Sequence, residues 1–162
     1  MAEEKLDIKQ EYEKIKSKYS LPDFDKLEKE FEIYQIKDNL KDSSYALRLT
    51  RRRIYDKIVF FCNVLERIIF PNPSSLILIN ESKFFSEQKH KEMYQVYKKL
   101  MKYERLSMSL DISNDESKNA EFIKALYKEW PRFRDYCQKI AQELSTRWEK
   151  EDDSEEKTGY MG

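Results

Sequence analysis

The chain contains few of the histidine and cysteine side chains that often carry out acid–base or nucleophilic catalysis, whereas its carboxylates are plentiful, so counting alone does not exclude a pair of catalytic carboxylates. His90 is its single histidine and lies between Lys89 and Lys91, where we expect solvent exposure. Cys62 and Cys137 each lie in an apolar helical stretch and lack the spacing of zinc ligands, so we expect buried thiols. No Glu-x-x-His pair is present to build a di-iron site in a helical bundle. We therefore predict that the protein is not an enzyme, with no catalytic, metal-binding or cofactor-binding residues and no cofactor.

The distribution of glycine excludes further classes of site. The two glycines are Gly159 and Gly162, so the first 158 residues contain none. Phosphate-binding loops, dinucleotide fingerprints and nucleophile elbows use glycine where the backbone must approach a ligand or adopt positive φ. The sequence therefore argues against nucleotide-binding and hydrolase folds of these kinds. It also lacks the usual residue for tight β-hairpin turns, which favours a helical body.

Basic residues gather in two clusters that are candidates for binding nucleic acid. The candidate residues are Arg48, Arg51, Arg52, Arg53 and Lys57 in the first cluster, and Lys98, Lys99, Lys102 and Arg105 in the second. Guanidinium groups bind phosphates through two hydrogen bonds, and clustered cations gain from counterion release. The alternative is that they pair with Asp and Glu on neighbouring helices. Residues 51–53 cover nearly a full helical turn, so they cannot all face one phosphate backbone.

Two apolar segments are candidates for binding a partner protein. The first consists of Leu76, Ile77, Leu78 and Ile79, and the second of Tyr160 and Met161. Residues 76–79 show no alternation, so a strand, a packed loop and an exposed surface remain open, and we expect a packed loop. Tyr160 and Met161 follow a charged run near the chain end, where aromatic side chains rarely contribute to a fold. They indicate either a short binding motif or a tail without function.

Charge is balanced over the 162 residues but unevenly distributed along them. Residues 41–105 carry 14 basic and 7 acidic side chains, whereas residues 149–162 carry 2 basic and 6 acidic ones. The acidic end could fold back on the basic middle. No apolar stretch approaches the length of a membrane span, and no signal peptide is recognisable at the N-terminus. We expect a cytoplasmic protein without membrane contact.

Hydrophobic spacing predicts an all-α fold, an irregular bundle of about five helices. The expected helices cover about residues 3–19, a short stretch after Pro22, and residues 44–70, 86–110 and 115–149. The helix at 44–70 is apolar on most sides and is expected at the centre. The helix at 115–149 has apolar residues alternately three and four apart from Ile123 to Leu144. Pro131 lies within it, so we expect a kink or a break there.

The same patterns predict the domain organisation. Residues 1–149 are expected to form a single helical domain, and residues 150–162 a charged, flexible C-terminal tail. In the helix at 86–110 we expect Met93, Val96, Tyr97, Leu100, Tyr103 and Leu106 to be buried. The residue types of the segment Ser113–Asp115 predict a turn followed by a helix cap.

Two resemblances accompany these patterns. The segments Leu21–Phe24, Phe84–Phe85, Tyr97–Leu110 and Glu121–Ile123 resemble a small all-helical family of uncharacterised archaeal proteins. That resemblance implies a cytoplasmic protein without an assigned activity. The order Arg52-Arg53, Lys57-Ile58, a loop and then Ser86-Glu87 opening a helix is similar to the helical domain of the replication GINS subunits. GINS subunits also carry a small β domain, and no glycine-punctuated strands are present here to form one.

These observations favour a non-catalytic interaction protein that acts as a factor or subunit on a larger cytoplasmic assembly. Its partner would be another protein or a large ribonucleoprotein assembly. The alternative function is an RNA- or ribosome-binding factor that uses the basic helical face. An enzyme of unrecognised type is a third hypothesis, which no group of catalytic residues in the sequence supports. Association with further copies of the same chain is compatible with the sequence.

Overall fold

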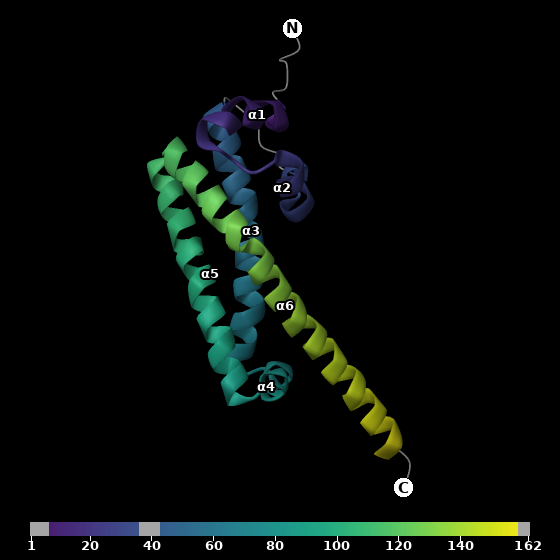
Figure 1. The fold of residues 1–162 in the computed structure, drawn as a ribbon. Helices are drawn as coiled ribbons and strands as arrows, with labels where there is room; N and C mark the ends of the chain where they lie inside the picture. The colour runs from purple at the N-terminus through teal and green to yellow at the C-terminus, as the bar shows by residue number, and fades with distance from the viewer. Residues whose placement is uncertain (1–6, 36–42, 159–162) are drawn as a thin grey trace. The chain divides into compact units, whose positions relative to one another are not determined.

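The fold is all-α, as the hydrophobic spacing predicts. A computed structural model describes residues 7–35 and 43–158, and within these ranges it contains helices and no strand. Figure 1 shows the helices, which are α1 (Ile8–Tyr19), α2 (Phe24–Phe31), the short 3₁₀ helix η1 (Ile33–Gln35), α3 (Ser43–Ile69), α4 (Leu76–Lys83), α5 (Glu87–Ser113) and α6 (Glu116–Thr158). The five predicted helices are all present, and α4 is additional.

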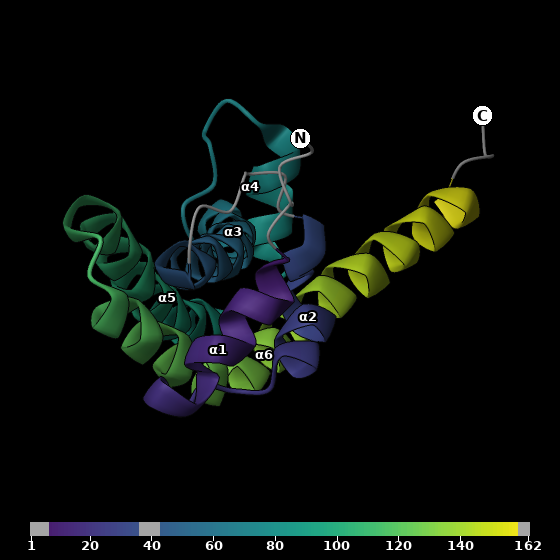
Figure 2. The same cartoon turned by 90° about the horizontal axis from the view of Figure 1, so that it is seen from above.

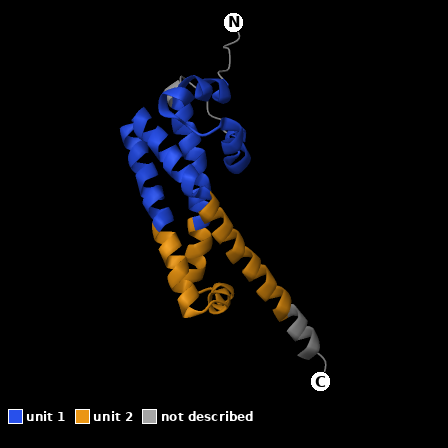
Figure 3. Ribbon diagram, in the orientation of Figure 1, with its two compact units in different colours: residues 1–61, 99–130 blue, residues 62–98, 131–162 orange. Residues whose placement is uncertain are grey.

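The chain divides into two compact units, which Figure 3 shows in different colours. Unit 1 comprises residues 1–61 and 99–130, and unit 2 comprises residues 62–98 and 131–162. The long helices α3, α5 and α6 each contribute one part to each unit. The single domain over residues 1–149 with a tail over 150–162 stays a prediction. Helix α6 continues to Thr158, nine residues beyond the predicted helix end.

The helices of unit 1 begin and end at polar residues. Asp7 and Asp23 cap α1 and α2, because their carboxylates accept hydrogen bonds from the Lys9 and Asp25 amides at 3.0 and 3.1 Å. The positions after α1, α2 and α5 have positive φ at Ser20, Glu32 and Asn114. Helix ends of this kind usually contain glycine, since a side chain costs about 1 kcal/mol in the left-handed region. The chain therefore builds these turns without glycine, at an energetic cost.

The core of unit 1 lies where α1, α2, α3 and the first part of α6 meet. Figures 1 and 2 show α1 and α2 beside this part of α6. Trp130 on α6 contacts Phe31 of α2 and stacks on Phe61 of α3, with ring centroids 4.6 and 4.9 Å apart. The indole N–H of Trp130 donates to Glu30 at 2.9 Å. The α6 segment of unit 1 is therefore fixed by both apolar and polar contacts.

The core of unit 2 contains the predicted continuation of the α6 apolar seam. Phe133, Cys137 and Ile140 are buried, as are Leu65 and Ile68 on α3. Both cysteines are buried, as the sequence predicts. Burial also raises the pKa of the Cys137 thiol to about 12, so the thiol stays protonated at neutral pH.

The packed loop predicted at residues 76–79 is wrong, and α6 is continuous at Pro131. Residues 76–79 are the first turn of α4 instead of a packed loop; the Ser75 hydroxyl caps this helix by accepting from the Leu78 amide at 3.4 Å. Helix α6 is continuous at Pro131, so there is no break, while the expected kink stays a prediction; the proline still removes the hydrogen bond to the carbonyl of residue 127. Its seam is buried on both sides of the proline, at Trp130 and Phe133, which holds the helix together.

The buried face of α5 also differs from the prediction. Met93 and Leu100 are fully buried as expected, but Leu106 is exposed, and the neighbouring Ser107 and Leu110 are buried instead. Positions 100, 107 and 110 share one helical face, while position 106 lies to its side. The buried polar contacts of Ser107, described below, explain why this face turns toward the core.

Candidate interaction surface

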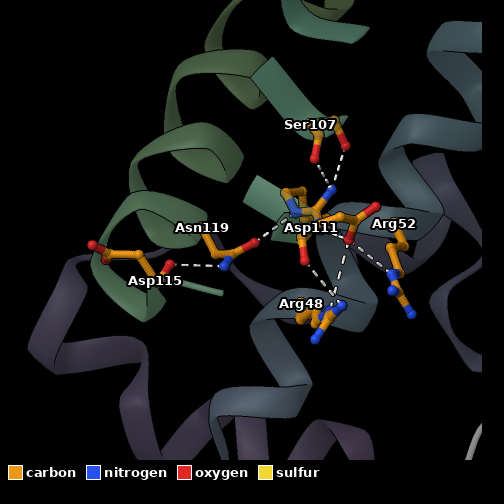
Figure 4. A network of polar contacts seen from close by, with 7 residues as sticks. Arg48, Arg52, Ser107, Asp111, Asp115 and Asn119 are labelled. Atoms are coloured by element: carbon orange, nitrogen blue, oxygen red, sulfur yellow. Dashed lines mark hydrogen bonds and ion pairs between the residues drawn. The ribbon is translucent and has the colours of Figure 1, made fainter. Parts of the chain in front are cut away.

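The first basic cluster is mostly occupied by internal contacts of unit 1. Arg51 is fully buried, and its guanidinium group is surrounded by acceptors from α5 and α6 (Figure 4). Its Nε donates to Asn119 Oδ1 at 2.6 Å, and its Nη1 donates to the Ser107 carbonyl at 3.0 Å and to the Ser107 hydroxyl. Its Nη2 donates to the Asp111 carboxylate. Arg51 is thus a structural tie between three helices, and its guanidinium is closed off from solvent.

The Asp111 carboxylate is shared by three arginines of α3. Besides Arg51, it accepts a hydrogen bond from Arg52 Nε at 3.0 Å, and Arg48 Nε lies 3.7 Å from the same oxygen. Arg48 Nη2 also donates to the Asp111 backbone carbonyl at 3.2 Å. Partial burial acts to raise the pKa of Asp111, but hydrogen bonds from Arg51 and Arg52 outweigh it and hold the pKa below its ordinary value. We call Arg48, Arg51, Arg52 and Asp111 the arginine cluster.

The remaining members of the first basic cluster pair with Glu32, at the end of α2. Arg53 Nε donates to the Glu32 carbonyl at 3.2 Å, and Lys57 Nζ lies 3.0 Å from the Glu32 carboxylate. Hydrogen bonding and attraction from Lys57 lower the pKa of Glu32. These contacts secure the positive-φ turn at Glu32. The sequence alternative, pairing with acidic residues of neighbouring helices, therefore describes the contacts of all five α3 residues.

The second basic cluster faces solvent on α5. Lys99, Lys102 and Arg105 are exposed in unit 1. Lys98 is also exposed but belongs to unit 2, where its ammonium group lies 5.1 Å from the Tyr94 ring centroid. Lys99 and Lys102 line a shallow pocket of about 260 Å³, together with Tyr103, Leu106 and Glu129. This cluster is available to an external ligand in a way that Arg51 is not.

Three exposed apolar side chains lie among the α5 cations of unit 1. Leu106 and Met108 are nearly half exposed, and Ile112 keeps 89% of its surface accessible. Residues 102, 105, 109 and 112 are spaced three and four apart and therefore share one face of the helix, with Leu106 and Met108 at its flanks. We call the exposed side chains of Lys99, Lys102, Arg105, Leu106, Met108, Ser109 and Ile112 the α5 face. The sequence analysis did not predict the apolar part of this face, because it expected Leu106 to be buried. The six-residue separation of Leu106 from Leu100, which places it to the side of the buried face, was the signal that could have shown its exposure.

The predicted apolar partner segment lies on unit 2. Leu76 and Ile77, at the start of α4, are 83% and 62% exposed, whereas Leu78 and Ile79 are partly buried. Leu78 also lines a groove of about 480 Å³ whose other walls are mainly polar side chains of α3. The exposed pair is therefore small and lies apart from the cations of unit 1 along the chain. Tyr160 and Met161 lie outside the described residues.

The described ranges place His90 and show whether metal-ligating side chains come together. His90 is partly buried, and its Nε2 lies 2.8 Å from the Ser82 carbonyl, which requires a proton on that nitrogen. Within the described ranges no three His, Cys, Asp or Glu residues come together to hold a metal ion. Among the same residues, no helix has both the length and the hydrophobicity required to span a membrane.

Comparison with known proteins returned no relative. No protein-family model matches the chain, and no curated protein or solved structure matches it either. The likenesses to an archaeal helical family and to the GINS helical domain therefore stay sequence-based predictions.

Proposed function

We propose that this chain is a non-catalytic interaction protein that docks on a partner protein through the α5 face. The observation that carries the proposal is the mixed character of that face, where exposed Leu106 and Ile112 flank Lys102 and Arg105. Scattered single apolar residues are common on protein surfaces, but here three lie on one helix among cations. The complementary surface is an apolar strip bordered by Asp or Glu side chains.

The apolar residues favour a protein partner over RNA. Burying an exposed aliphatic side chain contributes about 1.5–3 kcal/mol to binding. An apolar protein surface can bury Ile112 and Leu106 in this way, whereas a charged phosphate backbone cannot. The cations add orientation and a faster encounter with an acidic partner. Of the nine basic residues considered for nucleic-acid binding, the five on α3 already have acidic partners or protein acceptors. This internal pairing reduces the positive charge available for an electrostatic RNA site.

The proposal includes action on a larger cytoplasmic assembly. The two buried thiols support a reducing compartment, since cysteines of oxidising compartments more often pair as disulfides. The partner of the α5 face can be a single protein or a protein within a ribonucleoprotein particle. In either case, the contacted surface has to be apolar and bordered by acidic side chains.

Site-specific photocrosslinking tests the proposal. A photoreactive phenylalanine analogue at the exposed Ser109 should crosslink to one partner protein in native cell extract. Lys102→Glu with Arg105→Glu, and separately Ile112→Ser, should each abolish that crosslink. Lys139→Glu, an exposed lysine of unit 2, is the matched control and should leave it intact.

Three outcomes would contradict the proposal. A crosslinked product that ribonuclease destroys would indicate RNA, the alternative function, through the basic face. A crosslink to another copy of this chain would indicate homo-oligomerisation. A crosslink that survives both sets of substitutions but is lost in Leu76→Ser would assign the interface to α4 instead.

A further inference from the structure

The arginine cluster carries more positive charge than its contacts neutralise. Three guanidinium groups, those of Arg48, Arg51 and Arg52, share the single carboxylate of Asp111. Arginine remains protonated at all physiological pH values, so the cluster has an excess of two positive charges.

Nearby acidic side chains have other cationic partners. Glu116 lies 3.1 Å from Lys18, and Asp115 lies 3.9 Å from Lys118. Asp56 pairs with Arg53 at 3.2 Å, and Glu104 lies 3.7 Å from Arg105. Within the described ranges, these carboxylates therefore do not neutralise the cluster, and its described contacts leave two positive charges in excess.

Arg48 and Arg52 have hydrogen-bond donors left over. They lie four residues apart on α3, on the same face, and both reach Asp111 (Figure 4). The hydrogen bond of Arg52 uses its Nε and that of Arg48 uses its Nη2, so both Nη groups of Arg52 and the Nη1 of Arg48 have no hydrogen-bond partner among the described residues. Arg48 Nε is buried and also lacks a hydrogen-bond acceptor.

The guanidinium groups are held in place before any ligand arrives. Asp111 anchors both, and Arg51 in turn fixes Asp111 from the buried side through Ser107 and Asn119. A ligand that binds here does not have to order flexible side chains, which lowers the entropic cost of binding. The Arg52 side chain is 43% exposed and that of Arg48 is 19% exposed, so the donors are open to solvent at one edge.

We propose that Arg48 and Arg52 form a binding site for a phosphoryl dianion, supplied by inorganic phosphate or by a small phosphate monoester. A tetrahedral phosphoryl group can accept paired N–H donors from two guanidinium groups, and Arg48 and Arg52 lie on adjacent turns of α3. A dianion neutralises the excess of two charges, whereas each phosphodiester of RNA carries a single negative charge. Its donors come from α3 and not from side chains of the α5 face, so this proposal does not depend on the docking function, although Asp111 directly precedes Ile112 on α5.

Titration of the intact chain with inorganic phosphate tests this site. At about pH 7.5, where a phosphate monoester is mostly dianionic, the Nε–H NMR signals of Arg48 and Arg52 should shift with a dissociation constant on the order of 1 mM or tighter. Sodium chloride at equal ionic strength should not produce these shifts. Arg52→Gln should weaken binding at least about tenfold, and Arg52→Lys, which keeps the charge but loses the forked geometry, should weaken it as well.

Matched variants and ligands separate the outcomes. Arg147→Gln removes an exposed arginine that also pairs with a carboxylate, and should leave phosphate binding unchanged. Adenosine monophosphate binding more tightly than phosphate would identify a monoester as the ligand, and equal binding would identify free phosphate; both support the site. Absent shifts at Arg48 and Arg52, or shifts unchanged in Arg52→Gln, would overturn it. So would Arg52-dependent binding of single-stranded RNA without any response to phosphate.

Discussion

The buried position of Arg51 makes its replacement the sharpest test of how unit 1 is held together. Arg51→Met keeps a long, flexible side chain in place but removes the guanidinium donors. Ser107 Oγ and Asn119 Oδ1, both on residues about 1% exposed, would then lose a buried donor. Each loss costs about 1–3 kcal/mol. The Asp111 side chain is 39% exposed, so screening limits the lost ion pair to less than about 1 kcal/mol.

We therefore expect Arg51→Met to lower the free energy of unfolding by about 3 kcal/mol, within the range for breaking a buried charged network. Such a loss corresponds to a fall in Tm of about 6–12 °C for a chain of this size. Urea unfolding followed by far-ultraviolet circular dichroism measures the free energy, and a thermal scan measures Tm. Arg147→Met is the matched control, because this exposed arginine pairs with Glu143 one turn away and should cost less than about 0.5 kcal/mol.

A loss below about 1 kcal/mol in Arg51→Met would refute this reasoning. It would mean that water or a rearranged Asn119 satisfies the acceptors, and that the three helices do not depend on this tie. A similar loss in Arg147→Met would show that the assay responds to any lost arginine.

Four further predictions concern single positions. Asp111→Asn should reduce the loss of unfolding free energy that the wild type shows as pH falls. The folded pKa of Asp111 is depressed, so the carboxylate contributes its full stability above the unfolded pKa and loses it as pH falls through the folded pKa. Urea unfolding between about pH 5 and pH 2 measures this difference. Cys137, whose thiol pKa burial raises to about 12, should react with Ellman's reagent at about pH 8 in urea but not in the native protein. Ser20→Gly should stabilise the chain by about 1 kcal/mol, because Ser20 is exposed at positive φ. Pro131→Ala should stabilise it by about 1–3 kcal/mol by restoring a helical hydrogen bond, and urea unfolding measures both gains.

Each of these predictions has an outcome that contradicts it. An acid profile of Asp111→Asn that matches the wild type would show that the carboxylate gains nothing from its arginines. Rapid native labelling of Cys137 would mean that unit 2 opens readily. An unchanged or lower stability in Ser20→Gly or Pro131→Ala would show that the native backbone bears no cost at those positions.

The sequence alone determined the helical class and most helix positions, because hydrophobic periodicity is a local signal. The seam from Ile123 to Ile140 is buried as its spacing predicts, and a short helix, α2, begins soon after Pro22 as expected. The turn at residues 113–115 was equally readable, since Asn tolerates positive φ and Asp115 caps α6 through the Lys118 amide. Such features depend on neighbours within one or two helical turns.

The tertiary structure decided which charged residues are available to a ligand. Nothing local distinguishes Arg51 from Arg105, yet Arg51 is buried against Asp111, 60 residues away, and Arg105 faces solvent. The same long-range contacts draw Ser107 into the core and leave Leu106 exposed. A helical pattern specifies a face, whereas the polar partner on another helix decides which way that face turns. The α5 face and the arginine cluster therefore emerge from packing between segments that are far apart in the sequence.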